Sequence, residues 1–516
     1  MLFNSIEFVF LFMPTVLALV ALMHRAGLGR YIPVVLLCAS AGFYAWWNVN
    51  FLGLLAISIV ANYGLSRLMV AQKASSIGGW LLAIGLTGNL LALSYFKYAE
   101  FLMSILTGHS SSFDSAGIIL PLGISFYTFT QITYLIDAHQ RQIESYDFVT
   151  YALFVTYFPH LICGPILHHR DMMPQFAAVQ SRGLVASDVA LGLGIFAIGL
   201  FKKLIVADNI GFFANEFYDS MGAGRTTVSA VEAWSGALAY SLQLYFDFSG
   251  YSDMAMGVSR MFGVNLPFNF ASPFKATSII EYWRRWHISL TNLITAYIFN
   301  PIVLAVMQYR QREKLPGIRR GKAETFGAFL ALVAAPTVIS MTLAGVWHGA
   351  GWQFVAFGLL HGLYLSINHF WRMIDIGSLA WIPRSEIVRI WAARLVTLIA
   401  VVIAHVFFRA DTLDTAFQVL LAMVPHGDIA FAGSSDAVSI SQIALTLVLL
   451  AFVWWGPGTH EIVANSVPGP KGVTSSPLPG LVWRFDWPWL VATGVVLGMC
   501  APFMLGQAAK FLYFQF

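Results

Sequence analysis

Long apolar segments recur along almost the whole chain and constrain its fold more than any other feature. A helix needs about 20 predominantly apolar residues to cross the hydrocarbon core of a bilayer. Segments that approach or reach this length occupy residues 8–23, 32–47, 51–70, 80–96, 184–201, 230–245, 326–346, 352–367, 390–408, 440–455 and 487–505. Shorter or more interrupted segments lie at 118–136, 149–162 and 292–306. The sequence therefore predicts an all-α polytopic membrane protein with about 11 to 14 transmembrane and partial helices.

Composition supports a single membrane-embedded domain. The 516 residues are 58% hydrophobic and only 10% charged, which is typical of polytopic membrane proteins. Since no polar stretch is long enough to form a soluble domain, we expect one domain over residues 1–516. We place its catalytic core at about residues 118–410, followed by two C-terminal spans at 440–455 and 487–505. Polar residues lie close to apolar segments mainly inside this core, which is where chemistry is expected.

Charge and cysteine content exclude several classes of protein. The net charge is +4, and no basic face is interleaved with aromatic residues, so nucleic acid is not an expected partner. The three cysteines lie far apart and offer neither a disulfide framework nor a metal-ligand spacing. His168 and His169 are adjacent and cannot share one helix face, which argues against a metal site there. We therefore expect no bound metal and place His168 and His169 in a surface loop.

Charge placement also predicts the orientation. Glu7 precedes the first apolar segment, and Arg25 and Arg30 follow it, without the basic start of a cleaved signal peptide. The most basic loop, residues 309–322, contains a single acid among its lysines and arginines. Cytoplasmic loops carry an excess of Lys and Arg. We therefore expect this loop in the cytoplasm and the N-terminus on the other side.

The sequence ATSIIEYWRRWHISL, residues 276–290, predicts a helix at the level of the lipid headgroups. Ser278 and Glu281 have the spacing of a capping box. One stripe of the helix would contain Trp283, Trp286, His287 and Leu290, and the other faces would contain Arg284 and Arg285. The pattern alone favours an interfacial anchor with an incidental histidine. The other interpretation places His287 against a polar cavity and an arginine near an anionic donor such as a coenzyme A phosphate.

Two carboxylates stand out in LYFDFSGYSDMAMG, residues 244–257. On a helix Asp247 would stack beside Tyr251, and Ser249 beside Asp253. Carboxylates next to an apolar segment are costly unless they are paired, hydrated or functional. Two interpretations are evenly balanced: the carboxylates satisfy broken helix ends, or they line a binding site.

His348 occupies a short break between two apolar segments, in GVWHGAGWQF, residues 345–354. Only residues 347–351 separate the segments 326–346 and 352–367, so we expect His348 at a tight reversal or at a break between two helices, and Gly349 and Gly351 let backbone or substrate come close. A reachable histidine suits general-base chemistry. A histidine that merely fills a helix turn is an equally good explanation from spacing alone. For His361 and His405, which lie inside apolar runs, a packing role is favoured.

Several motifs together resemble the membrane-bound O-acyltransferase superfamily. They are CGPI at 163–166, YFDFSGYSDMA at 245–255, EYWRRWHISL at 281–290 and WHGAGW at 347–352. The segments MLFNSIEFVFLFMP and FFRADTLDTAF are similar to its bacterial alginate O-acetyltransferase branch, so the resemblance covers nearly the whole chain. It implies a ring of helices around a thinned centre with a tunnel. It also implies that His348 matches the histidine of a deep funnel, and His287 a second polar position.

The resemblance further implies a function. Acetyl-CoA would enter from the cytoplasm as a substrate, without a permanently bound cofactor, and His348 would act as general base. The acetyl group would cross the bacterial inner membrane to an alginate-type exopolysaccharide, with periplasmic acetyltransferase partner proteins and a periplasmic N-terminus. Besides catalytic His348 and His287, we expect substrate contacts from Trp283, Arg284, Arg285, Trp286, Trp347, Asp247, Tyr251 and Asp253.

Two alternatives remain open at this point. The same fold could carry another acyl group or acceptor, such as cellulose, or D-alanine for teichoic acid. A proton-coupled transporter that uses His348, Asp247 and Asp253 as a relay is less favoured, because the chain has no evident internal repeat.

Overall fold

The computed structural model describes residues 1–72, 76–107, 119–143, 146–225, 227–319, 322–373, 385–425, 439–473, 478, 480–505 and 512. The helices of the first half are α1 Met13–Arg25, α2 Ile32–Ala45, α3 Val49–Ala71, α4 Ser76–Leu93, α5 Ala99–Thr107, α6 Ile124–His139, α7 Phe148–Thr156, α8 His169–Arg182, α9 Ala186–Phe201, α10 Asp208–Gly222 and α11 Ala230–Met261. Those of the second half are α12 Ile279–Arg285, α13 Ile288–Ile294, α14 Asn300–Arg312, α15 Phe326–Phe329, α16 Ala335–His348, α17 Trp352–Met373, α18 Glu386–Arg409, α19 Leu413–Ala422, α20 Ile440–Trp455, α21 Thr459–Ile462 and α22 Trp487–Met504.

Short π-helical or 3-10 segments join several of these helices. The π-helical segments are η1 Glu7–Phe12, η3 Ser94–Tyr98, η4 Lys202–Ala207, η6 Thr295–Phe299 and η7 Leu330–Ala334, and the 3-10 segments are η2 Gly29–Tyr31 and η5 Pro273–Lys275. The only strands among the described residues are the two-residue β1 Ile318–Arg319 and β2 Lys322–Ala323, which pair antiparallel within the basic loop. The prediction of an all-α polytopic membrane protein is confirmed.

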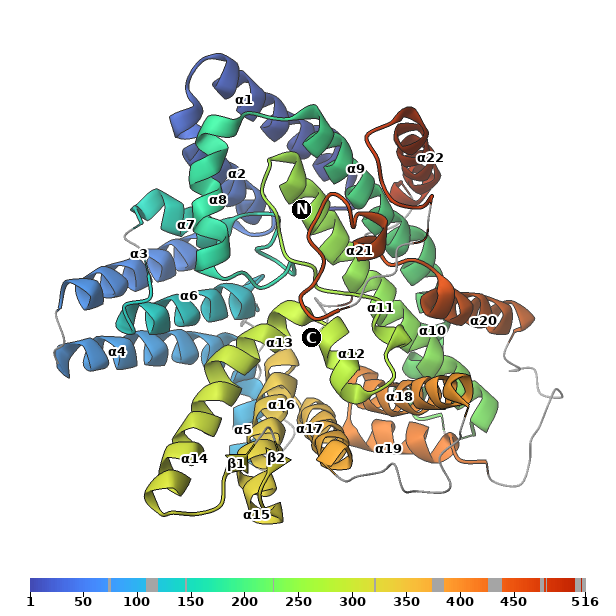
Figure 1. Cartoon of the computed structure of the whole chain (residues 1–516). Coiled ribbons are helices and arrows are strands. Elements are labelled where there is room, and N and C mark those ends of the chain that lie inside the picture. The colour runs from blue at the N-terminus through green and yellow to red at the C-terminus, as the bar shows by residue number, and fades with distance from the viewer. Residues whose placement is uncertain are drawn as a thin grey trace.

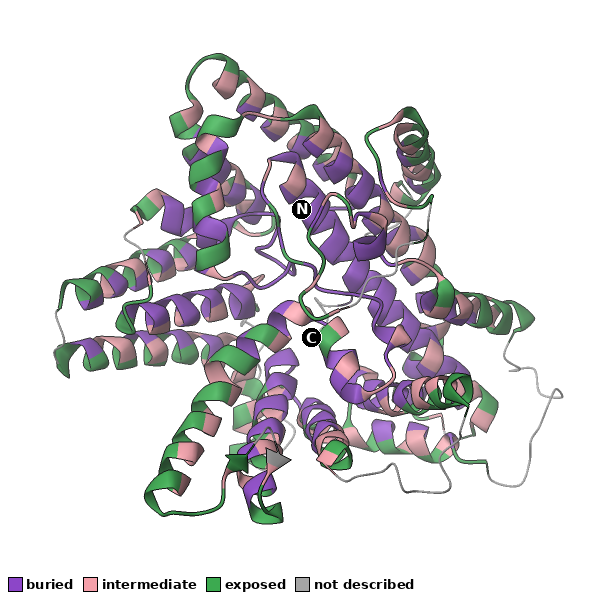
Figure 2. Ribbon diagram, viewed as in Figure 1, coloured by how far each residue is buried: buried purple, intermediate pink, exposed green. Residues whose placement is uncertain are grey.

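Eight helical stretches of the described chain are long and apolar enough to cross a membrane. They are Glu7–Arg25, Val49–Ala71, Ser76–Thr107, Ala186–Gly222, Ile288–Arg312, Phe326–His348, Glu386–Arg409 and Trp487–Met504, with shorter apolar helices at Gly29–Ala45, Leu413–Ala422 and Ile440–Trp455. In Figure 1 α3, α4, α14, α20 and α22 extend outward, whereas α11, α12 and α13 lie toward the middle of the view. Figure 2 shows the matching burial, because α11 is buried over most of its length and the outer helices expose their tips and outer faces.

The buried centre is built on the contact between α9 and α11. A Cβ atom at Gly257 would lie 2.5 Å from the carbonyl oxygen of Gly192, and one at Gly250 would lie 2.8 Å from that of Gly199. Small residues let two helix backbones approach closely inside a membrane, where packing drives helix association. Gly250 therefore serves a close backbone approach, and α11 runs unbroken through it.

Candidate active site

His348 is the last residue of α16, at the reversal that the sequence predicted. Gly349 leaves the helix in an extended conformation, and α17 begins at Trp352. A Cβ atom at Gly349 would overlap the ring of Phe354, and one at Gly351 would overlap the side chain of Gln353. Both glycines therefore leave room for side chains at the start of α17. His348 is only 5% exposed.

His287 lies in a break that the sequence did not predict. Residues 276–290 form two helices, α12 and α13, and His287 between them has a left-handed φ of +43°. The expectation of one continuous helix is wrong, because Asn269 binds the N–H groups after the break. Its carbonyl oxygen accepts from Ile288 at 3.0 Å, and its side-chain oxygen accepts from Ser289 at 3.2 Å. Left-handed non-glycine residues are uncommon and concentrate at functional sites.

The fold brings the two predicted histidines together at the buried centre. Their ring centroids are 6.3 Å apart, and the Trp347 ring lies 6.1 Å from His287 and 4.9 Å from His348. Phe248 of α11 meets the His287 ring edge on at 4.8 Å. The imidazole Nδ1 of His287 lies 3.3 Å from the side-chain oxygen of Asn269. Among the described residues, no hydrogen-bond partner is recorded for its Nε2 atom.

Two cavities lie near these histidines: His348 lines the first, and Ile288 and Ser289, the residues that follow His287, line the second. The first, the His348 cavity, has a volume of about 190 Å³ and is lined by Trp47, Lys97, Leu120, Pro121, Leu122, Gly123, Ile124, Ser125, Phe126, Ile162, Cys163, Trp347 and His348. The second, the Tyr297 cavity, has a volume of about 250 Å³ and is lined by Thr133, Ile166, Leu167, His168, Asp171, Pro267, Phe268, Ile288, Ser289, Asn292, Leu293, Ala296 and Tyr297.

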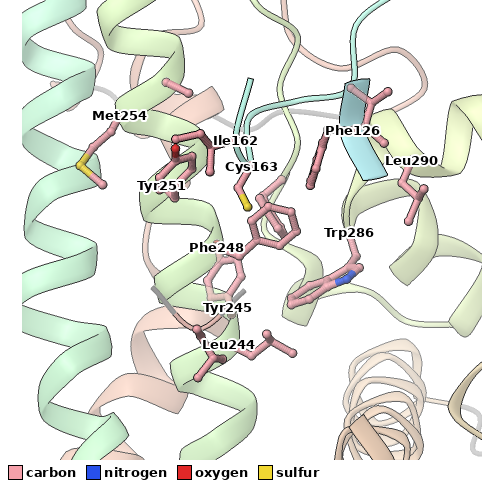
Figure 3. Close-up of a cluster of buried hydrophobic side chains, with 14 of the residues drawn as sticks. Phe126, Ile162, Cys163, Leu244, Tyr245, Phe248, Tyr251, Met254, Trp286 and Leu290 are labelled. Atoms are coloured by element: carbon pink, nitrogen blue, oxygen red, sulfur yellow. The ribbon is translucent and has the colours of Figure 1, made fainter. Parts of the chain in front are cut away.

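The two cavities are stacked along α6. Phe126 lines the first and Thr133 the second, and seven residues of an α-helix rise about 10 Å. The CGPI segment crosses between them, because Cys163 lines the His348 cavity and Ile166 lines the Tyr297 cavity. Figure 3 shows Cys163 within the buried cluster, close to Phe248. Asn269 links Ser289, which lines the Tyr297 cavity, to His287: its side-chain oxygen accepts from the Ser289 hydroxyl at 2.7 Å and lies 3.3 Å from His287 Nδ1.

The two predicted carboxylates of α11 pair with lysines of η4. Asp247 Oδ1 lies 2.6 Å from Lys203 Nζ, and Asp253 Oδ2 lies 2.6 Å from Lys202 Nζ and accepts from the Thr459 hydroxyl at 2.7 Å. Since α11 is continuous here, neither carboxylate caps a broken helix end. Tyr251 of the same helix stacks on Phe3 at 4.9 Å. The fold therefore places Asp247, Tyr251 and Asp253 in the buried packing behind the histidines, outside the lining of either cavity.

The tryptophans in and next to α12 are buried against aromatic rings, whereas Arg284 of the same helix is exposed. The Trp283 indole donates to His361 Nδ1 at 3.2 Å, and Trp286 stacks on Tyr282 at 5.6 Å. Arg284 is exposed, and no hydrogen bond or ion pair is recorded for it among the described residues. Of the two arginines, Arg284 is thus the one open to an anion.

Arg285 is held by its own helix and by the segment before that helix. Its guanidinium lies 2.8 Å from Glu281 Oε1 and donates to the carbonyl of Ala271 at 3.0 Å. Burial by itself would raise the pKa of the Glu281 carboxyl, but hydrogen bonds from Thr277 and the charge of Arg285 outweigh burial and hold that pKa below its usual value. As predicted, the Ser278 hydroxyl accepts the N–H of Glu281, at 3.2 Å.

Sequence reasoning missed a polar cluster beside the Tyr297 cavity. Asp137 Oδ2 lies 2.8 Å from His169 Nε2 and 3.1 Å from His168 Nε2, and it accepts from the Tyr297 hydroxyl at 2.9 Å. Asp137, His168 and His169 offer ligand atoms close enough to hold a metal ion. Adjacent histidines cannot share one helix face, but Asp137, near the end of α6, brings a third group to His168 and His169 from another helix. Hydrogen bonds already link the members of this cluster.

Comparisons with known proteins agree with this architecture. A model of the membrane-bound O-acyltransferase family matches residues 81–315. The peptidoglycan O-acetyltransferase of Helicobacter pylori is 37% identical over 100% of this chain and 98% of its own length. The chain belongs to the membrane-bound O-acyltransferase family. The probable alginate O-acetylase of Azotobacter vinelandii is 34% identical over the full length of both chains. The predicted family and its alginate-type branch are confirmed.

A more distant relative in this O-acyltransferase family is the teichoic acid D-alanyltransferase of Bacillus subtilis, 26% identical over 65% of this chain and 77% of its own length. The region that the family model matches includes His287 and ends before His348. The place of His348 in the site of this membrane O-acyltransferase therefore depends on the geometry described above.

Proposed function

We propose that the protein is an O-acetyltransferase that takes acetyl from cytoplasmic acetyl-CoA and passes it across the inner membrane for O-acetylation of an alginate-type polysaccharide. The observation that carries the proposal is the pair of buried histidines, 6.3 Å apart, with His348 in the lining of one cavity and the residues after His287 in the lining of a second. The names of the full-length relatives support an acetyl group and a polysaccharide. Because one of those relatives acts on peptidoglycan, peptidoglycan is the second candidate acceptor.

The chemistry is transfer from a thioester to a hydroxyl. His348 removes the proton of the acceptor hydroxyl while the oxygen of that hydroxyl attacks the acetyl carbonyl carbon. The C–S bond then breaks to release coenzyme A. The contact with Asn269 supports a role for His287. If Nδ1–H donates to the Asn269 side-chain oxygen, neutral His287 has a lone pair at Nε2. His287 therefore accepts a proton or a hydroxyl hydrogen bond, which favours a relay over polarisation of the carbonyl.

Two counts of membrane crossings support a periplasmic opening of the His348 cavity. With the N-terminus outside and the shorter helix Gly29–Ala45 counted as a crossing, Ser76–Thr107 is the fourth crossing and ends on the periplasmic side, and Lys97 lies in its second half. If the basic loop at residues 309–322 is cytoplasmic, the helical stretch Phe326–His348 that follows it also runs toward the periplasm, over a length of about 35 Å. The two counts agree, because Lys97 Nζ lies 2.6 Å from the Trp347 carbonyl oxygen. The Tyr297 cavity lies about 10 Å farther along α6 from this opening, and we assign it to the donor side. A periplasmic partner protein would meet the His348 cavity.

Labelling of Cys163 tests this orientation. In a C38S/C500S background Cys163 is the one remaining cysteine, and it lines the His348 cavity. We expect a small membrane-impermeant thiol reagent to label it from the periplasmic side of spheroplasts and not in inverted vesicles, with C163S as the unlabelled control. Labelling confined to inverted vesicles would reverse the assignment of the two cavities.

Donor binding is tested with the exposed arginine of α12. We expect Arg284→Ala to raise the KM for acetyl-CoA about tenfold with little change in kcat, because a hydrogen bond to a charged group is worth about 1.5–3 kcal/mol. The measurement is acceptor-dependent release of coenzyme A by purified protein. Arg30→Ala removes another exposed arginine and serves as the control. An unchanged KM would remove Arg284 from the donor site.

The same assay separates the alternatives. A D-alanyltransferase would require an aminoacyl carrier as donor and release no coenzyme A. A proton-coupled transporter would move its substrate into liposomes without cleaving any thioester. Unacetylated fragments of alginate, cellulose and peptidoglycan, supplied in parallel as acceptors, identify the polymer by which of them becomes acetylated.

A further inference from the structure

Lys97 is a charged side chain inside a membrane span that the chemistry above does not use. It lies in η3, and its Nζ donates to the carbonyl oxygens of Trp347 at 2.6 Å and His348 at 3.1 Å. The hydroxyl of the next residue, Tyr98, donates to the carbonyl of Val346 at 2.8 Å. Two consecutive side chains of one span therefore bind three consecutive carbonyls at the end of α16.

These carbonyls need partners from outside their helix. The last carbonyls of an α-helix have no intrahelical N–H partner, and they carry the negative end of the helix dipole. The chain itself provides no cap here, because Gly349 continues in an extended conformation. Lys97 and Tyr98 therefore fix the end of α16, and with it the backbone of His348.

A cap alone does not explain the charge. Tyr98 shows that a neutral donor can bind a carbonyl at this helix end, and an ammonium inside a span is costly unless it is paired or functional. Among the described residues, no carboxylate forms an ion pair with Lys97. Among the described residues that line the His348 cavity, Lys97 is also the only Lys, Arg, Asp or Glu. Its positive charge thus faces the same cavity as the His348 imidazole.

We propose that Lys97 is a further catalytic residue of the acyl transfer, one that supplies positive charge to the oxyanion formed during the reaction. This inference rests on the proposed function. As the acceptor oxygen bonds to the carbonyl carbon, the carbonyl electron pair moves to its oxygen, and His348 takes the hydroxyl proton. An ammonium has three N–H groups; two bind the carbonyls of Trp347 and His348, and the third serves the oxyanion. Collapse restores the C=O bond, breaks the C–S bond and returns the proton to the coenzyme A thiolate.

Three variants separate the charge from the cap. Lys97→Gln keeps a hydrogen-bond donor without the charge, Lys97→Arg keeps the charge, and Tyr98→Phe removes only the neighbouring cap. Loss of one oxyanion donor typically lowers kcat about 10²- to 10³-fold. With purified protein we expect that loss for Lys97→Gln, with a KM for acetyl-CoA within about twofold of wild type. We expect Lys97→Arg to recover at least about one tenth of the wild-type kcat, and Tyr98→Phe to lose less than about fivefold.

Two results would overturn the inference. One is a wild-type kcat in Lys97→Gln. The other is an equal loss in all three variants together with a lower thermal stability, which would reduce Lys97 to a structural cap. Failure of the proposed function has a different signature, because wild-type protein would then release no coenzyme A with any acceptor. If wild-type and Lys97→Gln protein transfer acetyl at the same rate and His348→Ala protein is inactive, the role of Lys97 is rejected and the proposed function stands.

Discussion

Replacing His348 with alanine is expected to lower acetyl transfer about 10²- to 10⁴-fold, the usual contribution of a general base. The physical reason is that an acceptor hydroxyl is a weak nucleophile until its proton is removed in the transition state. His348 lines the cavity that the acceptor would enter and lies at the fixed end of α16. The measurement is the acetate released by mild alkali from the polysaccharide of cells that contain equal amounts of variant and wild-type protein.

His405→Ala is the matched control for this experiment. His405 is also a buried histidine, 1% exposed, but it contacts the hydroxyl of Ser241 and lines neither cavity. We expect its loss to change acetylation only in proportion to any loss of protein. Wild-type acetylation by His348→Ala at normal protein levels would refute the role of the His348 imidazole.

Lys203→Met is expected to lower the free energy of unfolding by about 3–5 kcal/mol, the usual cost of leaving a buried charge without its partner. Lys203 Nζ lies 2.6 Å from both Asp247 Oδ1 and Asp208 Oδ1. The side chain of Asp208 is 41% exposed and can regain water, whereas that of Asp247 is 3% exposed and cannot. The measurement is unfolding in mixed micelles, or the midpoint of heat inactivation where unfolding is irreversible.

Two further variants identify the cause of that loss. The double variant Lys203→Met with Asp247→Leu removes both buried charges and should recover most of the lost stability. Asp219→Asn breaks the pair with Arg409, in which Asp219 is 72% exposed, and should cost at most about 1 kcal/mol. A double variant less stable than Lys203→Met would show that the side-chain volumes, and not the isolated charge, set the cost.

Local patterns were enough to predict some features of the site. Two long apolar runs with five residues between them leave His348 no place except a reversal, and α16 ends there. The capping-box spacing of Ser278 and Glu281 likewise marked the start of α12, because a helix start depends on neighbours a few residues away. The family resemblance added the pairing of His287 with His348, which spacing alone could not supply.

Other features depended on distant parts of the chain. The break at His287 arises from hydrogen bonds to Asn269 in a preceding loop, so helical periodicity could not reveal it. Helical spacing relates Asp247 only to residues of its own helix, such as Tyr251, whereas its ion-pair partner Lys203 comes from η4. Lys97 stands at the end of an apolar run, and only the folded chain shows that it meets the end of α16.

Inverted membrane vesicles from polysaccharide-producing cells provide the most direct test of the central claim, that the transfer of acetyl across the membrane depends on His348 as a general base. Acetyl-CoA labelled in its acetyl group is added outside, at the cytoplasmic face, and label is measured in the polysaccharide of the lumen. We predict that label accumulates in the lumen while free coenzyme A stays outside, and that His348→Ala vesicles show neither. Entry of intact acetyl-CoA, or lumenal acetylation by the His348→Ala protein at the wild-type rate, would contradict the account.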